Sequence, residues 1–241
     1  IQFIGSSKER IQEDYLRILR YFRFFAQYSK TDYDLDIIRS IRQHINGLNK
    51  ISNERTFDEL KKILTLKNAY SLFSHNIPKE IILSIFPQFK YYERLKIVDN
   101  LNQKIRNKYD NHLILALLIK NRFKNISINF ANLTSKKFYS EENIKKLIYL
   151  SSKDYVRDLL LFSICTNNKI KTSNIEKLLN YVSACAIPKF PISGDYLKKY
   201  GYVTGQTLGK KLKSLEEKWI ENNFVMNKKI VNKSLGKTNE N

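Results

Sequence analysis

The residues with the clearest potential for chemistry are Asp14 and Arg17, in the string RIQEDYLRILRYFRF at positions 10–24. Residues three apart are neighbours on a helix. A carboxylate only accepts hydrogen bonds and a guanidinium only donates them. Cytosine and adenine each present an amino donor beside a ring-nitrogen acceptor, whereas uracil and guanine present a carbonyl beside a ring N–H. One fixed acceptor–donor pair can therefore hold C and A and reject U and G, because the wrong base leaves buried polar groups unpaired.

Arg20 and Arg23 continue this series at three-residue steps. Guanidinium groups suit phosphate and ribose oxygens. Each step of three drifts by about 60° on a helix of 3.6 residues per turn, so Arg23 points roughly opposite Asp14. Arg23 can therefore serve structure or an RNA strand instead. The competing interpretation of all four charges is the solvated face of an amphipathic helix.

These residues need a helix, and the sequence predicts one over residues 8–27. Ser6 or Ser7 can cap its start. Leu16 and Phe24 depart from the apolar pattern, which indicates a helix covered on more than one side. One half of this helix carries apolar side chains at helical spacing: Ile11, Tyr15, Ile18, Leu19, Phe22 and Phe25.

The rest of the chain also reads as helices joined by short connections. Asp32 or Asp36 is expected to cap a second helix through Ile45, which Gly47 ends, and Ser52 is expected to cap a third. Only seven Gly and four Pro occur in 241 residues, which favours an all-α fold. Further helices are expected between Pro78 and Pro87, near 91–107, 111–123, 141–150, 153–166 and 173–186, and as a pair after the linker AIPKFPISG at 186–194.

The charge of the chain indicates a polyanionic partner. The formal net charge is +20, and the basic residues are spread along the whole sequence. Nucleic acid is the first candidate for such a surface, and a membrane surface is its competitor. No apolar run approaches the roughly 20 residues of a spanning helix. The two cysteines form no CxxC and the three histidines stand apart, so we expect no zinc site and a reducing cytoplasm.

The string at 10–24 closely resembles the signature helix of the bacterial tRNA nucleotidyltransferase and poly(A) polymerase family. Its Arg-Ile-x-Glu-Asp-x-x-Arg core is followed by two more arginines at three-residue steps. Three further pieces agree with this family in order and spacing. They are ISNER at 51–55, HLILALLI at 112–119, and the long segment at 190–224 that begins FPISGDYLKKYG. The resemblance thus covers nearly the whole chain.

The resemblance implies specific roles. Asp14 and Arg17 become a protein template for incoming CTP and ATP, and Arg20 and Arg23 match further nucleotide-contacting arginines. The expected partner is tRNA, held at its acceptor arm and 3′ end mainly through phosphates. Candidate tRNA contacts, each also explained as an ordinary solvated charge, are Lys198, Lys199, Lys210, Lys211 and Lys213.

The motif DYDLD places Asp32, Asp34 and Asp36 in alternation, as a two-metal site on a strand would require. No Gly-Ser turn precedes them, and capping explains Asp32 and Asp36, so we reject this reading. The family's metal-binding carboxylates lie in an α/β head domain that nothing in residues 1–241 matches. We therefore expect no catalytic residue and no metal site here, with Mg²⁺ entering only with a head domain in the same protein or in a separate chain.

The expected architecture is an elongated all-α arrangement: a nucleotide-selecting neck at 1–60, a body at 61–187 and a tail at 188–241. Three functions remain open. The first is CCA addition to tRNA by an enzyme of which this chain is one piece or one half, inactive without its head. The second is poly(A) addition by the same family. The third is a non-enzymatic basic RNA-binding module.

Overall fold

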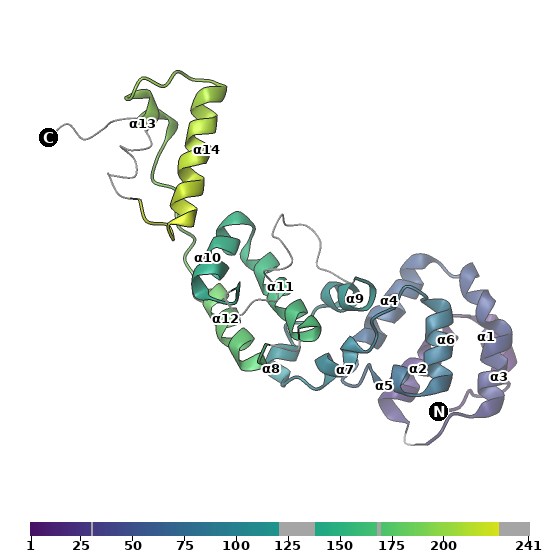
Figure 1. Cartoon of the computed structure of the whole chain (residues 1–241). Helices are drawn as coiled ribbons and strands as arrows, with labels where there is room; N and C mark the ends of the chain where they lie inside the picture. Colours follow the sequence, from purple (N-terminus) through teal and green to yellow (C-terminus); the bar gives the residue numbers. More distant parts are fainter. Residues whose placement is uncertain (30, 121–137, 168–169, 227–241) are drawn as a thin grey trace. The chain divides into compact units, whose positions relative to one another are not determined.

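A computed structural model of the chain describes residues 1–29, 31–120, 138–167 and 170–226 (Figure 1). These residues contain helices and short 3₁₀ turns and no strand, which confirms the all-α prediction. They fall into two compact units, Ile1–Ser127 with Leu161–Lys169, and Ile128–Leu160 with Ile170–Asn241. The division into neck, body and tail stays a prediction.

The first unit opens with two helices where one was predicted. Helix α1 spans Ser7–Glu13 and helix α2 spans Arg17–Tyr28. Between them Asp14 is extended, with φ −152° and ψ 104°. Its Oδ1 accepts a hydrogen bond from the Leu16 amide at 3.2 Å, so the side chain replaces the helical bonding of the backbone. The single helix over 8–27 was therefore wrong at its centre.

The break is held in place by Tyr15 and Gly47. Gly47 lies in the 3₁₀ helix η1 (Ile45–Lys50), and the Tyr15 ring lies against it. A Cβ atom at Gly47 would stand only 2.0 Å from Tyr15 Cδ1. Leu16, which departed from the apolar pattern, is 3% exposed. Helix α3 (Leu35–His44) ends before Gly47, so the prediction that Gly47 ends this helix was wrong.

The helix starts follow local capping chemistry. Ser6 caps α1 and Ser52 caps α4 (Asn53–Leu64), and both predictions are confirmed. Helix α3 is capped by Asp34, whose Oδ1 accepts from the amides of Asp36 and Ile37 at 2.9 and 3.3 Å. The motif thus supplies a cap as predicted, but the residue is Asp34 rather than Asp32 or Asp36.

The remaining helices of the first unit form its apolar interior. Arg94 closes the end of α9, because its guanidinium donates to the carbonyls of Leu117 and Lys120 at 2.8 and 2.7 Å. The helix predicted near 91–107 is divided in two, with Asn102 capping the second part. These helices are α5 (Ser71–Ser74), α6 (Asn76–Ile85), α7 (Arg94–Asp99), α8 (Gln103–Arg106) and α9 (Asn111–Ile119).

The second unit contains the helices predicted near 141–150, 153–166 and 173–186 and the predicted terminal pair. They are α10 (Glu141–Leu150), α11 (Lys153–Thr166) up to Leu160, α12 (Thr172–Ala184), α13 (Gly194–Lys198) and α14 (Gln206–Glu221). The terminal pair has a small core of Ile192, Leu197 and Leu215. Trp219 of α14 packs edge-on against Tyr149 of α10, with ring centroids 5.4 Å apart.

We expect Gly47→Ala to lower the free energy of unfolding by about 1–3 kcal/mol, because the new methyl group forces the Tyr15 ring to move. Chemical denaturation measures the change. Gly209→Ala is the matched control, since nothing lies within 4 Å of a Cβ there. It lies inside α14, where Ala stabilises a helix by up to about 1 kcal/mol relative to Gly. Equal midpoints for the Gly47 variant and the wild type would contradict this packing.

Candidate nucleotide-selecting site

The predicted nucleotide-binding residues lie around the break between α1 and α2. Asp14 occupies the break itself, Arg17 begins α2, and Arg20 and Arg23 follow on the same helix. Helix α4 of the same unit contributes Arg55 and Glu59 to this cluster.

The Asp14 carboxylate is held at both oxygens. Its Oδ2 lies 3.1 Å from Arg55 Nη2 and 3.6 Å from Arg20 Nη1, while Oδ1 accepts from the Leu16 amide. The side chain is 21% exposed. These contacts fix the orientation of a carboxylate that still has lone pairs free to accept from a ligand.

Arg17 has other partners than Asp14. Its Nη1 donates to the Arg10 carbonyl at 2.8 Å and to Glu13 Oε2 at 2.6 Å. Hydrogen bonds from Arg17 and Arg10 hold the pKa of Glu13 below its usual range, so this carboxyl stays ionised and keeps both arginines in place. Asp14 and Arg17 were expected to be neighbours on one continuous helix. They are not, because the helix breaks between them.

Glu59 is a buried carboxylate surrounded by three basic side chains. It is 1% exposed, and its Oε1 accepts a short hydrogen bond from Arg23 Nε. Arg20 Nε and Lys62 Nζ lie 3.9 and 3.5 Å from its Oε2. Arg23 also stacks its guanidinium 4.1 Å from the Phe24 ring. Arg23 thus pairs with Glu59 inside the unit. This agrees with the alternative, open from helix geometry, that Arg23 has a structural role.

Sequence reasoning did not single out Arg55 or Glu59. Arg55 lay within the quoted ISNER motif but received no role. Glu59 had a readable signal, because it stands at the spacing of the apolar face of α4, which buries Leu60, Ile63 and Leu64 as well. A carboxylate on such a face needs a buried cation.

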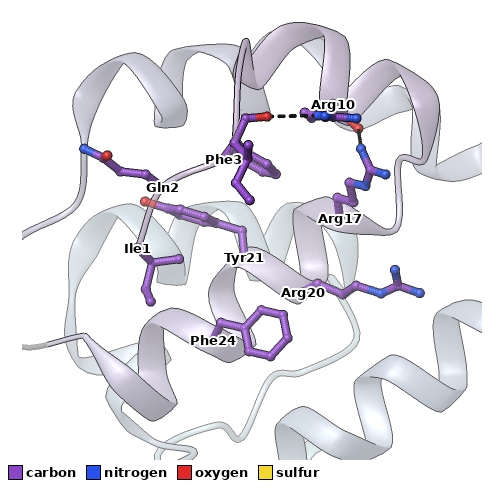
Figure 2. Close-up of a pocket in the computed structure, with 9 residues that line it drawn as sticks. Ile1, Gln2, Phe3, Arg10, Arg17, Arg20, Tyr21 and Phe24 are labelled. Carbon is purple, nitrogen blue, oxygen red and sulfur yellow. Dashed lines mark hydrogen bonds between the residues drawn. The ribbon is translucent and has the colours of Figure 1, made fainter.

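A cavity of about 390 Å³ opens beside this cluster (Figure 2). Arg10, Arg17 and Arg20 line it together with the rings of Tyr21 and Phe24, and residues 1–4 complete its wall. Figure 2 shows the three arginines beside these two rings. Cations and aromatic faces in one cavity suit an anion that carries a planar ring. Asp14 and Arg23 do not line this cavity.

The five candidate lysines belong to the second unit. Lys198 pairs with Asp195 at 2.9 Å, and Lys211 lies 6.0 Å from the centre of the Tyr202 ring. The other candidates, Lys199, Lys210 and Lys213, are exposed. Their surface position suits contacts with phosphates.

Two aspartates of the DYDLD motif have local structural roles. Asp34 is a helix cap, and Asp36 pairs with Arg39 at 2.7 Å. Across the residues that the structure describes, no group of three or more His, Cys, Asp or Glu side chains is arranged to hold a metal ion. The family resemblance places magnesium in a head domain, so no magnesium ligand is assigned to the described residues. No described helix is long and apolar enough to cross a membrane.

Known proteins are similar to this chain in sequence. The chain is 29% identical over 254 aligned residues to human mitochondrial CCA tRNA nucleotidyltransferase 1, across 95% of its own length. The chain is similar to CCA-adding enzymes. It is 42% identical over 66 residues to the CCA-adding enzyme of Streptococcus pyogenes serotype M1, which covers 27% of the chain and 16% of that protein. It is 25% identical over 183 residues to that of Staphylococcus haemolyticus, across 74% of the chain and 44% of the relative.

The similarity covers only part of each relative. The chain spans 56% of the human relative's length. Residues 34–92 match the family described as "Probable RNA and SrmB- binding site of polymerase A". This region runs from the cap of α3 and includes Arg55 and Glu59 of the cluster. The comparisons support the family resemblance of the sequence, and the broad similarity to a human protein does not restrict it to bacteria.

The buried ion pair predicts a double-mutant result. Glu59→Leu leaves Arg23 without its buried counter-charge and should lower the free energy of unfolding by about 3–5 kcal/mol. The double variant Arg23→Met/Glu59→Leu should lose only about 1 kcal/mol or less, because apolar side chains often replace a whole buried pair without cost. Denaturant titration of the single and double variants measures both values.

The matched control for this cycle is the exposed pair of Arg39 and Asp36. Arg39→Ala should change the free energy of unfolding by less than about 1 kcal/mol. Additive losses for Arg23→Met and Glu59→Leu would show that the two side chains do not act as a pair.

Proposed function

We propose that these 241 residues are the nucleotide-selecting and tRNA-holding C-terminal part of a CCA-adding tRNA nucleotidyltransferase. The observation that carries the proposal is the doubly anchored Asp14 carboxylate, held by Arg55 and Arg20 beside the arginine-lined cavity. The similarity to proteins named CCA tRNA nucleotidyltransferase supports it across 95% of the chain.

In this proposal the base is read by Asp14 and Arg17. Asp14 accepts from the amino group of C or A, and Arg17 donates to N3 of C or N1 of A. Arg17 lines the cavity at the start of α2, and its guanidinium has further N–H donors besides the Nη1 that contacts Arg10 and Glu13. Arg20 bridges Asp14 and the cavity and suits phosphate or ribose oxygens of CTP or ATP. Arg23 supports Arg20 through Glu59.

The reaction itself is assigned to a head domain, in the same protein or as a partner chain, which supplies carboxylates and magnesium. The present residues bind, orient and discriminate. Two cysteines that are free and buried are consistent with a reducing compartment such as the cytoplasm.

A second function has one observation in its favour. The family that matches residues 34–92 is described as a probable RNA- and SrmB-binding site of polymerase A. A poly(A) polymerase adds A only, and the same acceptor–donor pair would accept adenine. Addition of C as well as A separates the first function from the second.

Base selection tests the template directly, with a head domain supplied in cis or as a second chain. Asp14→Ala and Arg17→Ala should each reduce discrimination against U and G by about 1–3 kcal/mol, by analogy with bidentate side-chain–base pairing. The measurement is incorporation of all four nucleotides into tRNA lacking CCA. Affinity for tRNA should stay near that of the wild type.

Arg39→Ala is the matched arginine control, because Arg39 is exposed and pairs outside the cluster. It should leave selection unchanged. These 241 residues without a head should extend no tRNA, and extension would reopen the case for Asp32, Asp34 and Asp36. Unchanged preference for C and A in both Asp14 and Arg17 variants would end the template assignment.

Binding of tRNA should depend steeply on salt. The chain carries a net charge of +20, and each phosphate that a cation neutralises releases counterions. A gel-shift series should lose about 10³-fold in affinity or more between 50 and 200 mM salt if six or more phosphates are contacted. Flat or absent binding would contradict the RNA-holding role.

A further inference from the structure

The terminal helix pair exposes two tyrosines one helical turn apart. Tyr196 lies in α13 and Tyr200 follows its end, and each is 37% exposed. Their ring centroids are 5.1 Å apart with an interplanar angle of 43°, and their hydroxyls are 3.1 Å apart. The two rings therefore act as one aromatic surface.

The backbone that carries these rings is well fixed. Ser193 Oγ accepts from the Tyr196 amide at 3.2 Å and so caps α13. Leu197, between the two tyrosines, is fully buried in the small core of the tail. Gly201 ends the turn with φ +86°, which an L side chain rarely adopts. Little conformational entropy is left to lose when a ligand covers the rings.

The sequence around the pair is strongly basic. From Lys189 to Lys213 the sequence has six lysines and a single carboxylate, Asp195. Lys199 lies directly before Tyr200 and is exposed. A ligand for this surface must combine negative charge with flat apolar faces, and nucleic acid has both.

We propose that Tyr196 and Tyr200 form a platform on which exposed base faces of the bound RNA stack, while the neighbouring lysines contact its phosphates. The proposal rests on the proposed function and deepens it, because it adds base stacking to phosphate contacts. Phosphate contacts alone do not distinguish folded RNA from any other polyanion. Stacking requires bases that are not covered in a regular duplex, which a tRNA offers and a paired duplex largely does not.

The test uses the full chain and measures its dissociation constant for tRNA lacking CCA across a salt series. Tyr196→Ala and Tyr200→Ala should each weaken binding about tenfold, the scale of one lost stacking contact. The salt slope should stay that of the wild type, because no cation is lost. Lys199→Gln is the matched control, which should reduce the slope by about one.

Two further variants separate the ring from its hydroxyl and from general apolarity. Tyr196→Phe keeps the ring and should bind tRNA as the wild type does, whereas Tyr196→Leu should bind as poorly as Tyr196→Ala. A fully paired RNA duplex of equal length is the second probe, and all tyrosine variants should bind it equally. Unfolding midpoints of each variant confirm that the tail is folded.

Three results would overturn the platform but not the proposed function. They are unchanged tRNA affinity in the alanine variants, wild-type binding by Tyr196→Leu, and a reduced salt slope in the tyrosine variants. A protein-binding or membrane-binding surface would give the first of these results. Failure of the wild-type chain to bind tRNA at any salt concentration would instead overturn the RNA-holding part of the proposed function, and the platform with it.

Discussion

The candidate site depends on one buried carboxylate, Glu59. Removing a charge from water costs several kcal/mol unless a close partner compensates for it, so α2 must present Arg23 to α4 at this point. That requirement fixes the rotation of α2. Arg20, one turn earlier, then reaches both Glu59 and Asp14. Arg20, which contacts Asp14, thus takes its position from an ion pair that does not itself line the cavity.

The sequence predicted what local chemistry decides. Helix class, the caps Ser6 and Ser52, and the bounds of α10 and α11 depend on side chains within a few residues. The break at Asp14 depends on Tyr15 lying against Gly47, far along the chain, and helical periodicity contains no sign of that contact. Likewise the DYDLD motif offers three chemically equal caps, and periodicity did not identify Asp34.

For the candidate site too, the sequence predicted some residues and missed others. The family resemblance selected four residues, and the structure places all of them in one unit. It also assigns them different surroundings: Arg17 and Arg20 line the cavity, Asp14 is anchored beside it, and Arg23 turns inward. The partners responsible, Arg55 and Glu59, stand 41 and 36 residues from Asp14 and Arg23 in the chain. Spacing rules reach only three or four residues, so they could not find these partners.

The small core of the terminal helix pair has a consequence for local unfolding. Ile192, Leu197 and Leu215 alone bury too little apolar area to order α13 and α14. Tyr149 of α10 adds ring contacts with Trp219 and Phe224 and donates a hydrogen bond to Glu216. Burial and this hydrogen bond raise the pKa of Tyr149 to about 12, so the contact persists at neutral pH. Amide hydrogens of α10 and α14 should therefore exchange with solvent through one shared opening event.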